Sequence, residues 1–192
     1  MPIPVCVAPP AVDPVSLAEV KKHLRIEHSE EDTLIPAYIS AAVSHLDGWS
    51  GVLGRCLVTQ DWEERFERFG GVFRLVLGPV AEIVSIIVHS IDGATRTLAP
   101  ETYVLRVDAL GAFVAPAGGT GWVTSSGDDS IVIRYRCGTE AAKVPAAIRG
   151  AILLMVGDLY RYRETVALGP SSSIAMAADV AAMLAPYRLV LI

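Results

Sequence analysis

Apolar residues near the start of the chain recur at the spacing of an α-helix. Ser16 and Glu19 stand in the arrangement of a capping box, in which two side chains satisfy backbone N–H groups at a helix start. The apolar positions that follow share one face and predict a helix over residues 16–25: Leu17, Val20 and Leu24. Closely spaced prolines before this helix predict an extended arm over residues 1–15, which either packs on the protein's own surface or reaches a neighbouring subunit.

A longer amphipathic helix is predicted over residues 29–50. Its first turn, Ser29–Asp32, is acidic, which suits the positive end of a helix dipole, and Pro36 follows early in the helix. The apolar residues form a single stripe: Leu34, Ile35, Tyr38, Ile39, Ala42, Val43, Leu46 and Trp49. Gly48 and Gly51 end the pattern.

Residues 56–138 change to short segments rich in Val, Ile, Phe and Tyr, separated by Gly, Pro and Asp. This pattern predicts a β insert with strands near 56–66, 72–77, 82–91, 101–107, 112–115 and 130–137. The pair Asp92–Gly93 indicates a hairpin turn because it tolerates positive φ. In the last segment apolar and polar residues alternate, so that strand should have one polar side: Ile131, Ile133 and Tyr135 against Val132, Arg134 and Arg136.

A third, strongly apolar helix is predicted over residues 144–164. Pro145 stands in its first turn, where a missing N–H is tolerated, and the broad apolar face indicates burial on more than one side. The segment Gly169–Ser173 then breaks the chain before a tail over residues 166–192, with a weak helix near 174–184. Because this tail ends in apolar residues, it either closes the domain's own core or docks on a partner.

These elements together predict an α+β fold. We expect mainly a helical bundle, made of two N-terminal helices plus the long helix near 144–164, with an antiparallel β insert and a C-terminal tail. The helices and the β insert should form a single domain over residues 16–165. A chain of 192 residues suits one domain with an arm and a tail as extensions.

The composition narrows the function classes. Hydrophobic residues make up 52% and charged residues only 19%, and an apolar surplus of this kind favours oligomerisation. No stretch approaches the run of about 20 apolar residues that spans a bilayer. The net charge of −5 and the lack of a Lys/Arg run argue against tight DNA binding, although DNA could slide past an acidic surface. The first residues do not resemble a signal peptide, so we expect a cytosolic protein.

The sequence contains no recognisable catalytic or metal-binding motif. Its three cysteines, Cys6, Cys56 and Cys137, lack metal-ligand spacing and are interpreted as separate apolar residues in a reducing compartment. We interpret Asp61, Glu63 and Glu64 as a solvated strand face. We interpret Glu30, Glu31 and Asp32 as the acidic first turn of a helix. We therefore expect a protein that is not an enzyme, with no catalytic residues, no metal and no cofactor.

Four stretches of the chain, taken in their order and spacing, resemble the head–tail connector (adaptor) family of tailed phages and gene transfer agents. The stretches are Ser16–Ile26 with Glu31–Ile35, Leu77–Val80 with the Asp92–Gly93 turn and Tyr103–Leu105, Val144–Arg149 with Leu159–Glu164, and Leu184–Arg188. The resemblance covers nearly the whole chain from residue 15. The Pro-rich arm and the final segment Leu189–Ile192 depart from the family's pattern.

The resemblance implies a structural subunit of a ring, dodecameric in this family, between the portal and the stopper or tail of the particle. Such a ring extends the DNA channel. The implied partners are the portal protein, a stopper or tail-completion protein and further copies of the chain; DNA passes without specific binding, and no membrane is involved. The subunit would occur in the host cytoplasm during assembly and in the neck of the mature particle.

Two sets of residues are expected to make these contacts. The tail should bind the portal through Tyr187, Arg188, Leu189 and Leu191, and should become ordered when it does so. Contacts between subunits are expected at Trp49, Arg161 and Arg163. The alternative from a different class is a soluble ligand-binding or regulatory module that uses the β insert, with Gly118–Gly121 and Trp122 as its ligand loop.

Overall fold

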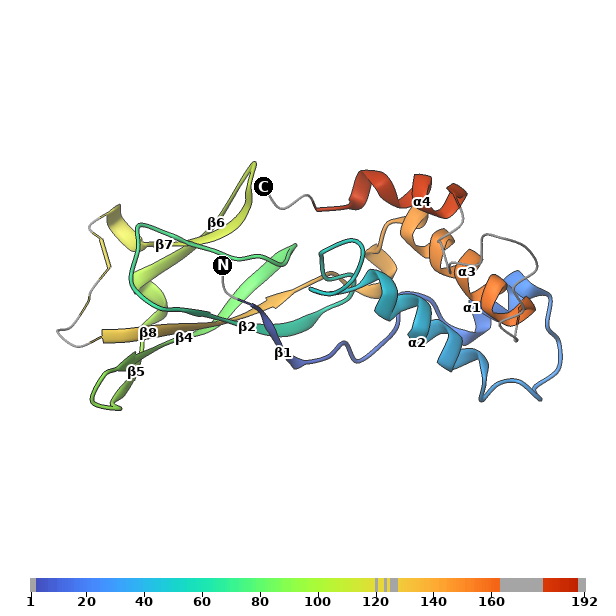
Figure 1. The fold of residues 1–192 in the computed structure, drawn as a ribbon, viewed down its shortest axis with the longest axis horizontal. Helices are drawn as coiled ribbons and strands as arrows, with labels where there is room; N and C mark the ends of the chain where they lie inside the picture. The colour runs from blue at the N-terminus through green and yellow to red at the C-terminus, as the bar shows by residue number, and fades with distance from the viewer. Residues whose placement is uncertain (1–2, 120, 123, 125–127, 163–177, 190–192) are drawn as a thin grey trace, which may run out of the picture. The chain divides into compact units, whose positions relative to one another are not determined.

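The computed structural model describes residues 3–119, 121–122, 124, 128–162 and 178–189 (Figure 1). The chain divides into two compact units. The β unit comprises Met1–Ala11 and Thr59–Thr139, and the helical unit comprises Val12–Val58 and Glu140–Ile192. The sequence predicted one domain over residues 16–165 and an arm over residues 1–15. In the structure the β insert forms a compact unit with residues 1–11 of that arm, and residues 12–15 belong to the helical unit.

Helix α1 (Leu17–Leu24) forms as its sequence predicts. The Ser16 hydroxyl accepts a hydrogen bond from the Glu19 N–H at 3.2 Å, and the Glu19 carboxylate accepts one from the Ser16 N–H at 2.8 Å. Arg25 ends the helix in the left-handed conformation, with φ of 57°. The predicted range 16–25 is thus the helix together with its two caps.

Helix α2 (Ile35–Leu46) is shorter than the predicted 29–50, and this prediction was wrong at its start. Residues 29–34 form turns, and Pro36 stands in the first turn of the helix. A start at Ser29 would put Pro36 in the helix interior, where its missing N–H and its ring break the hydrogen-bond pattern. At the other end Asp47 is the C-cap and Gly48 has a positive φ of 75°.

Helices α3 (Ala146–Arg161) and α4 (Ala178–Leu184) complete the helical unit. Helix α3 is shorter than the predicted 144–164, because Pro145 is its N-cap and Tyr162 its C-cap. The predicted break at 169–173 lies outside the described residues, and α4 corresponds to the end of the weak helix predicted over 174–184. The core joins apolar side chains of the four described helices: Val20 of α1, Ile35, Ile39, Ala42, Val43 and Leu46 of α2, Ile148, Ala151, Ile152 and Val156 of α3, and Val180 and Leu184 of α4.

The β unit contains two antiparallel sheets. The five-stranded sheet has the order β1 (Val5–Ala8), β2 (Gln60–Phe66), β8 (Asp128–Cys137), β4 (Val80–Ser90), β5 (Thr95–Thr97). The three-stranded sheet has the order β3 (Phe73–Arg74), β7 (Gly111–Pro116), β6 (Tyr103–Asp108). Short 3-10 turns occur at Pro100–Thr102, Ala117–Gly119, Ala141–Lys143 and Ala185–Tyr187.

The fold is therefore mixed α/β, with four α-helices and two antiparallel sheets in the described residues. The antiparallel insert is confirmed, whereas the description of the protein as mainly a helical bundle is not. The strands β1 and β5 were not predicted: β1 occupies the Pro-rich arm between Pro4 and Pro9, and β5 is only three residues long. None of the described helices combines the length and apolar composition needed to cross a membrane.

Strand β8 confirms the alternation seen in its sequence. Ile131, Ile133 and Tyr135 are fully buried, while Arg134 and Arg136 on the opposite side are partly exposed. Successive strand residues point to opposite faces, so the apolar residues face the core of the β unit and the arginines face away from it. The same periodicity decides which residues of the neighbouring strand β2 become buried.

We expect the Ile152→Ala substitution in α3 to lower the free energy of unfolding by about 2–5 kcal/mol, since it leaves a cavity in the helical core. Ile152 is fully buried. Leu154→Ala two residues away is the matched control, because Leu154 is 40% exposed and should cost less than about 1 kcal/mol. Urea denaturation followed by circular dichroism measures both. Equal losses for the two variants would contradict the assignment of the core.

Candidate functional site

The expected portal-binding residues of the tail lie against the segment that follows α2. The Leu189 N–H donates a hydrogen bond to the Leu53 carbonyl at 3.0 Å, and Tyr187 packs against the helical core. Arg188 is exposed, and Leu191 lies outside the described residues. The described part of the tail thus rests on its own unit through backbone and ring contacts, while Arg188 and the Leu189 side chain remain accessible to a partner.

The segment Leu53–Arg55 lies against the tail. Gly54 has a positive φ of 61°, and a Cβ built at this glycine would lie 3.8 Å from the Leu189 Cβ. Burial lowers the pKa of Arg55, with Tyr187 acting against that shift. Neither residue was singled out from the sequence, because a glycine and an arginine in a loop carry no pattern that links them to a tail more than 130 residues away.

The expected inter-subunit residues do not come together within one chain. Trp49 is half-buried in the turn after α2, and Arg161 is exposed at the end of α3, with its guanidinium 5.6 Å from the centre of the Tyr162 ring. Tyr160, near the end of α3, hydrogen-bonds Glu31, just before α2, so the two helices run antiparallel. Trp49 and Arg161 consequently lie at opposite ends of this helix pair, and Arg163 lies outside the described residues.

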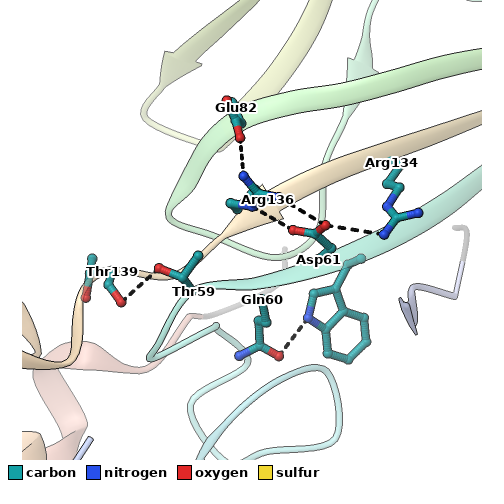
Figure 2. Close-up of polar contacts among 8 residues, drawn as sticks. Thr59, Gln60, Asp61, Glu82, Arg134, Arg136 and Thr139 are labelled. Carbon is teal, nitrogen blue, oxygen red and sulfur yellow. Dashed lines mark hydrogen bonds and ion pairs between the residues drawn. The ribbon is translucent and has the colours of Figure 1, made fainter. Parts of the chain in front are cut away.

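A charged network that the sequence did not predict occupies the outer side of the five-stranded sheet (Figure 2). Asp61 on β2 accepts hydrogen bonds from Arg136 at 2.8 Å and from Arg134 at 3.3 Å, and Arg136 also contacts Glu82 at 2.6 Å. Asp61 and Arg136 are register partners, as are Glu82 and Arg136. The hydrogen bond from Arg136 holds the pKa of Asp61 below its ordinary value, so its carboxylate stays charged.

Glu64 corrects the interpretation of Asp61, Glu63 and Glu64 as a solvated face. Glu64 is fully buried and Asp61 is nearly so, and only Glu63 is partly exposed. The Glu64 Oε1 accepts hydrogen bonds from the Tyr135 hydroxyl at 2.5 Å and from the Val76 N–H at 2.9 Å. Its Oε2 is buried without a hydrogen-bond partner among the described residues. The alternation along β2 was the available signal, because Glu64 shares its side of the strand with Trp62.

Burial raises the pKa of Glu64 from 4.5 to about 6, and the hydrogen bonds from Tyr135 and Val76 act against this shift. Burial and the nearby Glu64 carboxylate also raise the pKa of Tyr135. The Glu64 carboxyl is therefore protonated in the folded state below about pH 6, and the Tyr135 phenol keeps its proton. Such a pair holds the Leu75–Leu77 segment to the sheet through the Val76 N–H.

The remaining residues singled out from the sequence have structural partners. Lys21 forms an ion pair with Asp32 at 2.6 Å and Tyr160 contacts Glu31, so the acidic turn packs on neighbouring helices. Cys56 and Cys137 are each disulfide-bonded, so the interpretation of these two cysteines as separate reduced residues was wrong. In the part of the chain that the structure describes, no three His, Cys, Asp or Glu side chains gather as metal ligands do.

Trp122, which the alternative reading placed in a ligand loop, belongs to an aromatic cluster of the β unit. Its ring centre lies 4.8 Å from that of Phe73 and 6.0 Å from that of Phe69. Its indole N–H donates to the Gly71 carbonyl at 3.3 Å. Thr120, between the glycines of that loop, lies outside the described residues. The described contacts of Trp122 are thus those of a packed side chain.

We expect the free energy of unfolding to fall by about 2 kcal/mol as the pH rises from about 4.5 to about 7, because Glu64 has a raised pKa when folded. The folded state binds the proton more tightly, so its stabilising effect is complete at low pH and is lost as the pH passes through 6. Urea denaturation across this range measures the change. Glu64→Gln should remove the fall and Glu63→Gln, on the other side of β2, should keep it. The same fall in both variants would assign the effect to another group.

Asp61→Asn should lower the free energy of unfolding by about 1–3 kcal/mol, because it leaves two arginines without their shared counter-ion. Its side chain is only 9% exposed, whereas that of Glu82 is 56% exposed. Glu82→Gln is therefore the control and should cost less than about 0.5 kcal/mol. Thermal denaturation at low and high salt compares the two. A larger loss for Glu82→Gln would show that the network is held from the exposed side instead.

The resemblance to head–tail connectors is confirmed by a family match. The family described as phage gp6-like head-tail connector protein matches residues 14–64, which span α1, α2 and most of β2. Proteins with curated annotation give no match.

Solved structures of particle necks share the fold along almost the entire chain. A chain from the neck of an empty GTA particle, computed with C6 symmetry, has a TM-score of 0.77 at 18% identity, covering 99% of this chain and 97% of that chain. A chain from the virion of a native gene transfer agent (GTA) particle has a TM-score of 0.77 at 19% identity, with the same coverage. A third, from the neck of a native GTA particle with C12 symmetry, has a TM-score of 0.73 at 19% identity, covering 100% and 97%.

Proposed function

We propose that this chain is a structural subunit of the neck that connects head and tail in a phage or phage-derived particle. The observation that carries the proposal is the fold shared with gene transfer agent neck chains over 99% of this chain. The match of residues 14–64 to head-tail connectors supports it independently of the fold. In this role the protein is not an enzyme, and its charged and aromatic clusters serve packing.

The subunit forms a dodecameric ring between the portal and the stopper or tail-completion protein. The neck structures that contain chains of this fold were computed with C6 and with C12 symmetry. A ring of twelve subunits is consistent with both, because a twelvefold axis is also a sixfold axis. Rings need head-to-tail contacts between unlike surfaces of identical subunits. Trp49 and Arg161 lie at opposite ends of the α2–α3 pair. We place both residues, together with Arg163, in contacts with neighbouring subunits.

The ring extends the DNA channel and lets DNA pass without specific binding. Tight binding to duplex DNA rests on arginines and lysines that neutralise phosphates. The net charge is −5, and Arg134 and Arg136 are already paired with Asp61. A net negative charge of this kind disfavours tight binding to the DNA phosphates. The subunit is made in the host cytoplasm and becomes part of the neck of the mature particle.

The portal contact is made by the accessible side of the tail. Arg188 and the Leu189 side chain are exposed, while the backbone of Leu189 is held by Leu53. Leu191, which lies outside the described residues, is placed in the same portal contact. Docking of a short apolar end in clefts of a larger ring suits sequential assembly, because the tail finds its partner only after the portal has formed.

Light scattering of the purified chain with and without its cognate portal tests this function. We expect a complex larger than the portal by the mass of a subunit ring, formed with portal present, because the portal supplies the symmetric template for the ring. A chain that stays monomeric and leaves the portal's mass unchanged would contradict the proposal.

The tail contact is tested by variants in the same measurement. Leu189→Asp places a charge on the accessible side of the tail and should weaken portal binding by about tenfold or more. Val12→Asp is the control, since Val12 is also exposed in the helical unit, at 58%, and lies far from the tail in sequence. Equal weakening by both would point to a general effect of added charge.

A further inference from the structure

Strand β1 differs from the other open edges of the two sheets because it carries no charge. The open edges of the described sheets are β1, β5, β3 and β6. Strands β5 and β3 are three and two residues long and contain Arg96 and Arg74, and β6 ends in charged residues. Short length and charge are the usual protection of an edge against pairing with another chain. Strand β1 has neither charge nor a charged flank within residues 3–10.

The side chains of β1 reinforce this contrast. Val5 is 61% exposed, Ile3 just before the strand is 72% exposed, and Val7 is 39% exposed. Ile3 and Val5 share one face of the strand, because successive residues point to opposite faces. Cys6 on the other face is also exposed, and Val7 stands at an irregularity in the pairing with β2. Pro4 and Pro9 limit the length of the strand. Because β1 already pairs with β2, the N–H and C=O groups of alternate residues in Val5–Ala8 face the open edge. An apolar edge that is exposed on this scale indicates a surface that becomes covered.

The complementary surface lies on β6 and its hairpin turn. With six residues β6 is the longest of the open edges, and Val107 and Leu110 at its end are 72% and 68% exposed. Of the charges near this end, Arg74 and Asp108 are paired with each other at 2.7 Å, and Arg106 of β6 is exposed. The uncharged strand β1 is therefore matched by the longest open edge, whose end carries the exposed apolar side chains of Val107 and Leu110.

We propose that β1 of one subunit adds to the β6 edge of a neighbouring copy in the ring. The two edges belong to different sheets of the β unit, and Figure 1 shows β6 and its turn along the upper side of that unit and β1 along the lower side. A contact between unlike edges of identical subunits is head-to-tail, which is the kind that closes into a ring. Main-chain hydrogen bonds supply the pairing, and Val5, Val7, Val107 and Leu110 lose exposed apolar surface. This inference rests on the proposed ring function and names the surfaces that build the ring.

Photo-crosslinking in the assembled complex identifies the partner of β1. A benzophenone amino acid replaces Val7, light and heavy isotope-labelled subunits are mixed, and the complex is assembled on the portal. We expect crosslinks from residue 7 to the peptide containing residues 103–110, found as light–heavy pairs because they join different copies. Crosslinks confined to one copy, or made to the portal or to another surface, would overturn the inference.

A charge variant tests whether the contact is needed for assembly. Val5→Lys should reduce the fraction of subunits in ring-sized complexes by about tenfold or more, because a lysine cannot be buried unpaired at low cost. Ile91→Lys is the matched control: Ile91 is 82% exposed in the turn between β4 and β5, and its variant should assemble like the wild type. Circular dichroism should show both variants folded, because both positions are exposed in the subunit.

The outcomes separate this inference from the proposed function. A wild-type ring that persists in Val5→Lys overturns the role of β1 and leaves the neck function standing. A wild-type chain that forms no ring with its portal overturns the neck function, and the inference falls with it. Loss of assembly in Val5→Lys and in Ile91→Lys alike would also overturn the inference, since it would show sensitivity to any added charge on the β unit.

Discussion

The register of strand β8 is the constraint on which the β unit depends. This strand pairs with β2 on one side and β4 on the other, so it fixes the position of both. A shift by one residue would turn Tyr135 outward and bring Arg134 and Arg136 into the core. Polar contacts on both faces of the strand oppose this shift. Tyr135 hydrogen-bonds Glu64 on the buried face, and Arg136 hydrogen-bonds Asp61 on the opposite face. Burial of apolar residues and pairing of charges thus select the same register.

In the helical unit, the tail shows how one segment can serve both its own fold and a partner. The sequence left two alternatives, closure of the domain's own core or docking on another protein. The backbone of Leu189 and the ring of Tyr187 are committed to the unit, yet the Leu189 side chain and Arg188 are exposed. The two alternatives are therefore compatible. The Leu189 backbone and the Tyr187 ring contact the protein's own unit, and the Leu189 and Arg188 side chains are free to contact a partner.

The sequence predicted those features whose signals are local. The capping box of Ser16 and Glu19, the apolar stripe of α2 and the alternation of β8 each arise from neighbouring residues, and each is found in the structure. The start of α2 was misplaced because the acidic turn was given more weight than Pro36. The Asp61 network and the β1–β2 pairing were missed because they join residues about 55 to 75 positions apart, whose pairing depends on sheet order. The contact residues with partners remain predictions, since one chain does not contain its partners.

Glu64 shows why a perturbed pKa is a poor guide to function in this fold. Raised carboxyl pKa values are typical of catalytic acids, so the group would attract attention in a protein of this kind. A catalytic acid must reach its substrate, however, and Glu64 is fully buried with Oε1 occupied by Tyr135 and Val76. Its raised pKa follows from the same burial that places it beside the Leu75–Leu77 segment. Protonation lowers the free-energy cost of burying the Glu64 carboxyl. Its hydrogen bonds in turn attach the Leu75–Leu77 segment to the sheet. In a subunit whose proposed role is to hold its shape within a ring, such an attachment serves rigidity and not chemistry.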